Sequence, residues 1–299
     1  MWLKFLLGAC FVLSLLGALV LELGPPRADA GSRGDIRDVS DKIDRGQDAR
    51  SLRLLTWNIG NGDLESETRA HAEDLSAVAG VIMDNDADAV ALQELTGEDQ
   101  LKLLLTHLKN HYRGYVCSRG KGDRVEAVLV RDRSDGSERG DRSDRSLRFS
   151  DVPAGDRFAA AATFRLHQDV PEIVFISAHA DAFSASRRRT FAADVVDWAR
   201  SRTKNELAFV AGDFNFEVST RNKTNLFTDD AKHDSESYAY LLKYFRDLGL
   251  DAGETSINDR RIDYVFGPGE TVSLRRAEVL RGVAVGRMDH LPLLVEVAL

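Results

Sequence analysis

Four apolar segments of this chain end in side chains that can bind a metal ion or move a proton. The clearest is residues 207–211, which leads directly into Gly212-Asp213-Phe214-Asn215. An apolar strand that ends in an acid and an amide places charge in a cleft while the strand itself stays dry, as hydrolytic sites require. Four such ends predict one shared site, and the other three are Asn58 after 52–57, Gln93-Glu94 after 89–92 and His179 after 173–178.

A further acid lies inside an apolar segment. Asp263 falls within residues 262–266, and an unpaired buried carboxylate costs several kcal/mol. His290 is its natural partner, because an imidazole oriented by an acid can take a proton from water or stabilise a charged transition state. A lone histidine is more often structural, but the place of His290 beside Asp289, at the start of an apolar strand, favours the catalytic interpretation.

Glu94 is the best candidate for a metal ligand. It is a hard carboxylate at the end of an apolar strand, and Asn58 and Asp289 are candidates to complete the shell. Oxygen ligands of this kind favour Mg²⁺ or Mn²⁺ over zinc. Taken alone, Glu94 would equally well be a capping or ion-paired acid that follows a strand.

The composition indicates one catalytic domain over residues 51–299. The 299 residues are 43% hydrophobic and 29% charged, which supplies enough apolar surface for a large core. A formal charge of −8 argues against a high-affinity nucleic-acid scaffold but allows an enzyme that binds polyanions transiently with the help of metal ions. Cys10 and Cys117 are the only cysteines, so no disulfide framework is expected.

Residues 1–30 have the pattern of an export signal or a membrane anchor. The run 5–21 carries no charge, and Ala28-Asp29-Ala30 provides the small residues of a cleavage site. Cleavage is favoured over an uncleaved anchor, since the run is slightly short for a bilayer span. Either outcome predicts a catalytic domain outside the cytoplasm, preceded by a polar linker over residues 31–50.

Helical periodicity alternates along the domain with strand-like segments. There are too many strands for a simple doubly wound sheet, and the short link between 158–166 and 173–178 favours antiparallel pairing. Two mixed sheets packed face to face, with helices on the outer faces, would bury every apolar face. The expected helices cover 75–83, 101–108, 191–199 and 238–248, and the expected strands 52–57, 89–92, 125–130, 158–166, 173–178, 207–211, 262–266 and 292–298.

Two arginine-rich segments have open roles. Residues 131–148 alternate arginine with acids, serine and glycine, which favours a solvated loop or hairpin tip over a substrate-gripping loop. The run Arg187-Arg188-Arg189 is either a solvated helix start or a phosphate grip. Arg187 is its candidate substrate contact.

Together, these motifs resemble the endonuclease/exonuclease/phosphatase superfamily, which includes deoxyribonuclease-I-like nucleases, neutral sphingomyelinases and inositol-polyphosphate phosphatases. Order and spacing agree over nearly the whole domain. Two positions depart from the pattern: Met288 stands where the family often has serine, and Glu217 adds an acid that would either repel a phosphate or face solvent. The motifs are Thr56-Trp57-Asn58, Gln93-Glu94, Ser177-Ala178-His179, Gly212-Asp213-Phe214-Asn215, Arg261-Ile262-Asp263-Tyr264 and Met288-Asp289-His290.

The resemblance implies an α/β four-layer sandwich whose site lies at the top of its two sheets. It implies that Glu94 holds Mg²⁺ with Asn58 and Asp289 nearby. It further implies that the remaining residues act on the phosphate: Asp213 and Asn215 position the water and the scissile phosphate, His179 contacts the phosphate or assists the leaving group, and Asp263 orients His290.

The expected reaction is attack of water on a phosphodiester, with Mg²⁺ as the Lewis acid. Whether Asp213 or His290 is the base stays open, as does the substrate, because loops grafted on the shared fold decide it. A monomeric, exported nuclease is the first expectation. The alternatives are a sphingomyelinase-type phospholipid phosphodiesterase, for which Phe183 and Phe227 lie in candidate rim loops, an inositol-phosphate phosphatase, and a non-catalytic binding protein on the same fold.

Overall fold

A computed structural model describes most of the domain that the sequence predicts. The predicted leader, the linker and Phe227 lie outside the described residues, as does most of the 131–148 segment. None of the helices described combines the length and apolar character that crossing a bilayer requires. The described residues are 51–60, 69–120, 124–132, 146–167, 169–202, 207–218, 231–256, 259–283, 285 and 288–299.

The described helices and strands include all those that the sequence predicts, in the predicted order. In order they are β1 (Ser51–Asn58), α1 (Arg69–Asp84), β2 (Ala89–Leu95), α2 (Glu98–His107), β3 (Tyr112–Val116), β4 (Val125–Arg131), β5 (Arg148–Ala154), β6 (Arg157–Phe164), β7 (Ile173–His179), α3 (Ala185–Arg202), β8 (Leu207–Asp213), α4 (Ala231–Leu242), β9 (Arg246–Asp247), β10 (Asp263–Gly267), β11 (Ser273–Val279) and β12 (Leu293–Ala298).

The strands form two sheets of six, each with both parallel and antiparallel neighbours. The first has the order β11-β12-β1-β2-β4-β3 and the second β5-β6-β7-β8-β10-β9. The pairs β1/β2 and β7/β8 are parallel, and the short link between β6 and β7 joins antiparallel neighbours as expected. The prediction of two mixed sheets is confirmed.

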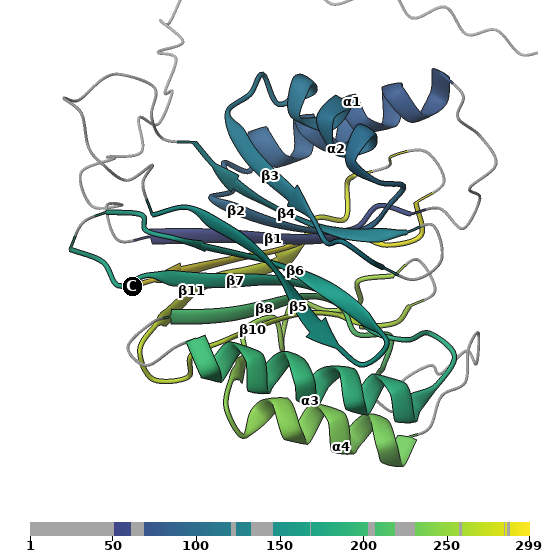
Figure 1. Cartoon of the computed structure of the whole chain (residues 1–299), viewed down its shortest axis with the longest axis vertical. Coiled ribbons are helices and arrows are strands. Elements are labelled where there is room, and N and C mark those ends of the chain that lie inside the picture. Colours follow the sequence, from purple (N-terminus) through teal and green to yellow (C-terminus); the bar gives the residue numbers. More distant parts are fainter. Residues whose placement is uncertain are drawn as a thin grey trace, which may run out of the picture. The chain divides into compact units, whose positions relative to one another are not determined.

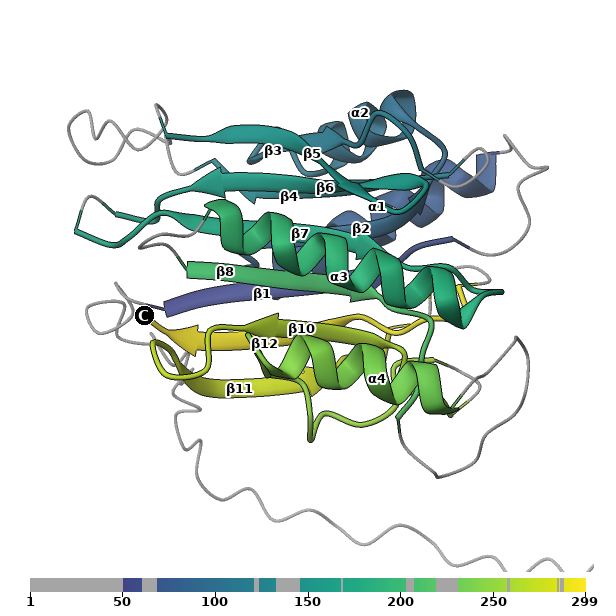
Figure 2. The ribbon, with the colours of Figure 1, turned by 60° about the horizontal axis from the view of Figure 1, so that its bottom comes forward.

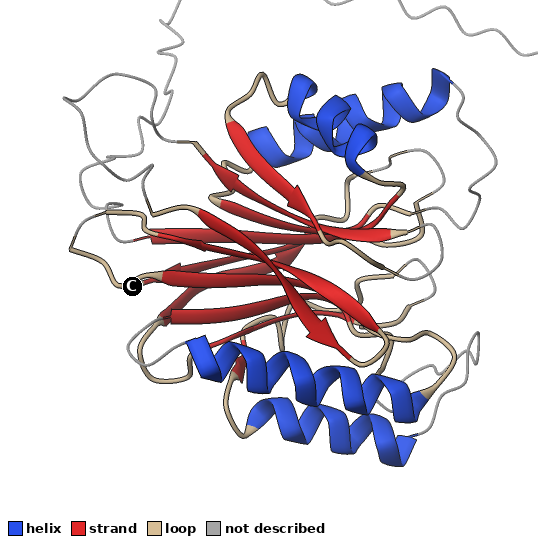
Figure 3. Ribbon diagram, viewed as in Figure 1, coloured by secondary structure: helices blue, strands red, loops and turns tan. Residues whose placement is uncertain are grey.

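The sheets pack face to face, and a helix pair covers the outer face of each (Figures 1 and 3). Helices α1 and α2 lie over the first sheet, while α3 and α4 lie over the second (Figure 2). One apolar cluster fills the space between the sheets, and two others join each sheet to its helices. The four-layer α/β sandwich is confirmed.

Side-chain alternation along β1 shows how the sandwich positions chemistry. Leu52 and Leu54 enter the core between the sheets, whereas Leu55 and Trp57 pack under the helices. Because successive residues of a strand point to opposite faces, Asn58 at the strand end faces the opposite sheet. The apolar strand therefore aims its terminal polar residue into the gap between the two sheets.

All eight predicted strands lie inside the sheets. The four strands that the sequence did not reveal, β3, β5, β9 and β11, are the four sheet edges. Edge strands lack a neighbour on one side and carry more polar, exposed side chains. In β11, for example, only Val279 is buried. Their sequences therefore lack the apolar pattern on which the predictions rested.

Two further expectations need correction. Helix α4 ends at Leu242, so Phe245 and Leu248 lie beyond it although both are buried. The 131–148 segment is no hairpin tip between its flanking strands, because β4 and β6 belong to different sheets. Both described ends of the segment are ion-paired. Arg131 contacts Asp86, and Arg148, the first residue of β5, lies 3.1 Å from Glu172.

Arg188 joins α3 to α4 inside the protein, so it is neither a solvated helix start nor a phosphate grip. It is fully buried, and its Nε and Nη2 donate to Asp234 Oδ1 and Oδ2 at 2.9 and 3.1 Å. Its Nη1 donates to the Asp181 carbonyl at 3.0 Å. A buried bidentate pair of this kind is costly to break, because each partner alone would be an uncompensated charge.

The Arg188→Met substitution is expected to lower the free energy of unfolding by about 3–5 kcal/mol, because it leaves the Asp234 carboxylate buried without its cation. Chemical denaturation measures the loss. Arg189→Met is the matched control, since Arg189 pairs with Glu236 at 2.9 Å on the exposed side of the same helix. It should change stability by no more than about 1 kcal/mol. Equal effects of the two substitutions would contradict a structural role for Arg188.

Candidate active site

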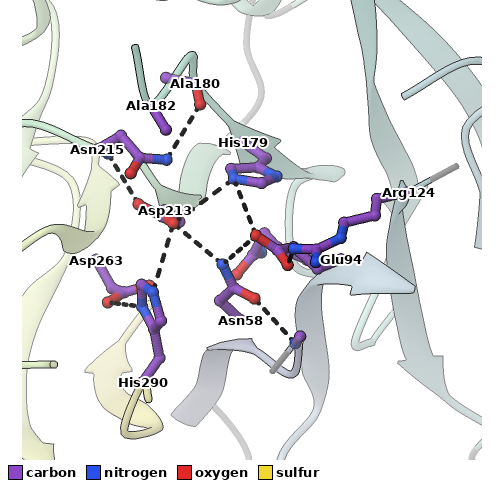
Figure 4. Close-up of polar contacts among 12 residues, drawn as sticks. Asn58, Glu94, Arg124, His179, Ala180, Ala182, Asp213, Asn215, Asp263 and His290 are labelled. Atoms are coloured by element: carbon purple, nitrogen blue, oxygen red, sulfur yellow. Dashed lines mark hydrogen bonds and ion pairs between the residues drawn. The ribbon is translucent and has the colours of Figure 1, made fainter. Parts of the chain in front are cut away.

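Three neighbouring strands of the second sheet place His179, Asp213 and Asp263 side by side. His179 pairs in register with Asp213 across the parallel β7/β8 pair, and Asp213 pairs with Asp263 across the antiparallel β8/β10 pair. The strand alternation that buries Phe175 and Phe209 between the sheets also turns these polar side chains toward the first sheet. Figure 4 shows them converging with side chains of the first sheet.

The first sheet contributes Asn58 and Glu94 from adjacent strands. Asn58 is in register with Gln93 at the ends of β1 and β2. Glu94 has a φ of 64° at an irregularity in the β2/β4 pairing, between Leu92 and Leu95. Such a bulge redirects one side chain and is typical of functional sites.

Gly60 leaves the space that Glu94 occupies. A Cβ atom at position 60 would lie 2.0 Å from Glu94 Oε2, so a larger residue would displace the carboxylate. The backbone N–H of Gly60 also donates to Asn58 Oδ1 at 3.0 Å. The turn after β1 thus fixes both the carboxylate and the amide.

Asn58 connects the acids of the two sheets. Its oxygen is engaged by Gly60, so its Nδ2 faces the carboxylates, lying 3.3 Å from Glu94 Oε1 and 3.1 Å from Asp213 Oδ2. One amide therefore holds two acids near one another across the gap between the sheets, and in this arrangement Asn58 presents donors to them.

Asp213 is the centre of the site. Its Oδ2 lies 3.6 Å from His179 Nε2 and 3.7 Å from His290 Nε2, besides accepting from Asn58. Its Oδ1 accepts the backbone N–H of Asn215 at 2.8 Å. Asn215 has a φ of 51° and donates through Nδ2 to the Ala180 carbonyl at 3.2 Å. The sequence prediction that these residues share one site agrees with their placement.

His290 is held by Asp263, as the sequence predicts. Its Nδ1 lies 2.8 Å from Asp263 Oδ2, and its backbone carbonyl accepts from Trp57 Nε1 at 3.1 Å. Burial alone would lower the pKa of His290, but the charges of Asp263 and Asp213 outweigh it and raise the pKa to about 10. At neutral pH the imidazole is therefore a cation that directs Nε2 at Asp213.

The sequence analysis missed a second acid–histidine arrangement. Glu126 is fully buried in β4, and its Oε1 lies 3.4 Å from His179 Nδ1. Cys117 Sγ donates to the other oxygen at 3.1 Å. Burial, with the charge of Glu126, raises the pKa of the Cys117 thiol well above its usual range, so it remains a donor. An acid inside the apolar segment 125–130 is the signal that marked Asp263 and would have found Glu126.

A buried polar bridge beneath the site ties the two sheets together. Gln93 Nε2 donates to Ser177 Oγ at 3.0 Å, and Ser177 Oγ donates to the Leu92 carbonyl at 3.0 Å. Thr56 Oγ1 donates to Gln93 Oε1 at 3.4 Å. Gln93 therefore acts beneath the site rather than in it, and it fixes the strand ends that carry the functional groups.

The two remaining candidate residues, Asp289 and Arg187, lie at the border of the site. Asp289 is half-buried beside His290, and its charge partly opposes the lowering that burial imposes on the pKa of Arg124. Arg187 is exposed on the first turn of α3, 3.7 Å from Asp181 and 3.8 Å from Asp156. None of the ion pairs found in the described part of the chain joins Arg187 to the residues around Asp213.

Glu217 takes neither of the positions expected for it. Its side chain is buried, Oε2 lies 3.6 Å from Arg260 Nε, and Oε1 accepts the backbone N–H of Arg261 at 3.4 Å. An acid paired in this way does not face solvent, and its charge is offset close by. The residues that follow Asn215 therefore add no free negative charge to the site.

The donor set suits a divalent cation. Carboxylate oxygens of Asp213 and Asp263 lie within 4.8 Å of each other beside the protonated His290, and Glu94 adds a carboxylate on the other side of Asn58. Asp263 Oδ1 is buried and accepts no hydrogen bond from the described residues. Oxygen-rich groups of this type match the preference of hard cations.

Solved structures with a similar fold include three proteins of different kinds. One is the human Nocturnin catalytic domain with bound sulfate anion, at 16% identity and TM-score 0.61 over 83% of this chain and 94% of that one. Another is a mannosyl-6-phosphatase of Bacteroides thetaiotaomicron, at 18% and 0.58 over 83% and 100%. The third is a D. rerio TDP2 humanized by 14 mutations, at 14% and 0.60 over 84% and 100%. At these identities the likeness shows the fold.

No curated protein matches the chain. The family assignment rests on the sequence model of the Endonuclease/Exonuclease/phosphatase family, which matches residues 55–285. That match spans well over half of the chain and includes Asn58, Glu94, His179, Asp213 and Asp263. The chain belongs to the endonuclease/exonuclease/phosphatase family, whose members are metal-dependent phosphoric ester hydrolases.

Proposed function

We propose that this protein is an exported, Mg²⁺-dependent phosphodiester hydrolase that acts on nucleic acid as an endonuclease. The observation that carries the proposal is the convergence of Asn58, His179 and His290 on one carboxylate, Asp213, with Glu94 on the far side of Asn58. A single chain supplies every group, which supports action as a monomer. Export rests on the predicted leader, residues 1–30.

The negative charges around His290 favour Asp213 over His290 as the base. With a pKa raised to about 10, His290 carries its proton at neutral pH and has no free nitrogen to accept another. Asp213 is an acceptor that Asn58 and the Asn215 backbone hold in place. In the proposed reaction Asp213 takes the proton of the attacking water, while His290 and His179 face the phosphoryl oxygens and the leaving group.

Glu94 is the proposed anchor of the metal ion, with Asp289 and Asn58 beside it. Mg²⁺ bound there would act as a Lewis acid on the phosphate and offset its negative charge. Mn²⁺ prefers similar oxygen donors and should replace it. Asn215 and His179 are the proposed phosphate contacts. Arg187 is a more distant proposed contact at the rim.

A lipid phosphodiesterase of the sphingomyelinase type is the second candidate. Phe183 is 61% exposed in the loop that leads from β7 to α3, directly after the strand that carries His179. Asp181 holds this loop by accepting the backbone N–H groups of Phe183 and Ser184 at 2.7 and 2.9 Å. A rigid loop that presents an aromatic ring suits a membrane surface as well as a nucleobase.

A substrate panel separates these candidates. The full-length protein is incubated with supercoiled plasmid DNA, RNA and sphingomyelin vesicles, each with Mg²⁺ and with a chelator, and Asp213→Asn serves as the inactive control. Plasmid nicking that the chelator and the substitution both abolish is the expected result. Release of choline phosphate with the plasmid left intact would replace the nuclease with the lipid enzyme, and failure to hydrolyse any substrate would favour a non-catalytic binding protein.

A further inference from the structure

Arg124 contacts the proposed metal ligand directly. Its Nη1 forms an ion pair with Glu94 Oε2, while Glu94 Oε1 faces Asn58 and His179 at 3.3 and 3.7 Å (Figure 4). The two side chains are largely buried, with 19% of Arg124 and 14% of Glu94 exposed. An arginine of this chain therefore holds the carboxylate that a metal ion would need.

The local fold brings this pair together. Arg124 immediately precedes β4, whose Val125 pairs with Leu95 of β2, and the irregularity between Leu92 and Leu95 turns Glu94 toward it. Gly60 also packs against the Glu94 carboxylate, because only a residue without a Cβ fits there. The contact is thus built from adjacent strands and a glycine turn.

The charge of Arg124 opposes the binding of a metal ion to the same carboxylate. A guanidinium and a divalent cation that share one carboxylate would repel each other at close range, where the repulsion is weakly screened. Asp289 adds a second negative charge that acts on Arg124. In the structure the Arg124 guanidinium is the cation that offsets these two acids.

We propose that Arg124 and the metal ion compete for Glu94, and that metal binding frees the Arg124 guanidinium to hold a phosphate of the substrate. The second half rests on the proposed function. A guanidinium offers parallel N–H donors that match two phosphate oxygens, and this match gives strong bidentate bonds. A chain with a net charge of −8 needs such a local cation to admit a polyanion.

The competition is tested by calorimetric titration of the full-length protein with Mn²⁺ alone. Arg124→Met should bind Mn²⁺ about tenfold more tightly than the wild type, because the competing charge is gone. Arg124→Lys keeps a cation and should stay within about threefold of the wild type. Arg119→Met is the matched control, since it removes the same charge from an exposed arginine that donates to the Asp156 carbonyl. Unchanged or weaker Mn²⁺ binding by Arg124→Met would overturn the competition.

The release of Arg124 is tested with inorganic phosphate as the probe. With Mn²⁺ saturating, the wild type should bind phosphate about tenfold more tightly than Arg124→Met, whereas without metal the two should bind it equally weakly. Equal phosphate affinity of the two proteins with Mn²⁺ present would overturn the release. Neither titration requires turnover, so a protein that hydrolyses no phosphodiester would still show the competition, and the two failures remain distinguishable.

Discussion

Replacing Asp213 with Asn is expected to lower kcat by about a thousandfold or more, on the scale of a lost general base together with lost charge stabilisation. The substitution keeps the shape of the side chain but removes the proton acceptor and the negative charge. Asp213 Oδ2 faces Asn58, His179 and His290, so one change affects every contact at the centre of the site. Steady-state hydrolysis of a chromogenic phosphodiester with saturating Mg²⁺ measures the loss.

Asp197→Asn is the control for this prediction. Asp197 lies exposed on α3, where it accepts from Tyr240 at 3.1 Å, so its charge can be removed without touching the site. It should leave kcat unchanged. If Asp213→Asn kept more than about a tenth of the wild-type kcat, Asp213 would not be the base.

The second large effect is expected for Glu94→Gln. An amide in place of the carboxylate should weaken Mn²⁺ binding by about a hundredfold, because the ligand charge that attracts the cation is lost. Activity at low Mg²⁺ should disappear with it and return in part at high Mg²⁺. Titration calorimetry with Mn²⁺ provides a measurement that does not depend on turnover.

Glu98→Gln is the matched control, since Glu98 lies four residues further along the chain in the exposed first turn of α2. Its Mn²⁺ affinity should equal that of the wild type. A Glu94→Gln protein with wild-type metal affinity would place the metal elsewhere, with Asp213 and Asp263 as the remaining carboxylates.

The inner strands and their chemistry could be predicted from sequence for one physical reason. A strand that is buried on both faces has a continuous apolar sequence. The first polar residue after it marks the place where the strand reaches the edge of the sandwich. Strand alternation then decides the direction, so Asn58 and Asp213 face each other across the two sheets. The resemblance of the motifs to a known family added the roles of the residues.

What the sequence did not reveal depends on tertiary contacts. The edge strands carry mixed polarity, so their pairing is visible only in the sheet order. Arg188 looks like its two arginine neighbours in the sequence, yet of the three only Arg188 is buried, where it pairs with Asp234 between α3 and α4. A bulge in β2 brings Glu94 to Arg124. A bulge cannot be predicted from apolar periodicity, because it interrupts the alternation of the strand.

The central claim is that the group around Asp213 hydrolyses a phosphodiester with the help of a divalent cation. The most direct measurement is the release of p-nitrophenol from bis(p-nitrophenyl) phosphate by the full-length protein. Release that requires Mg²⁺ or Mn²⁺, stops with a chelator and is lost in Asp213→Asn is the predicted result. A folded, metal-loaded protein that releases none, or release that the chelator and Asp213→Asn leave unchanged, would contradict the claim.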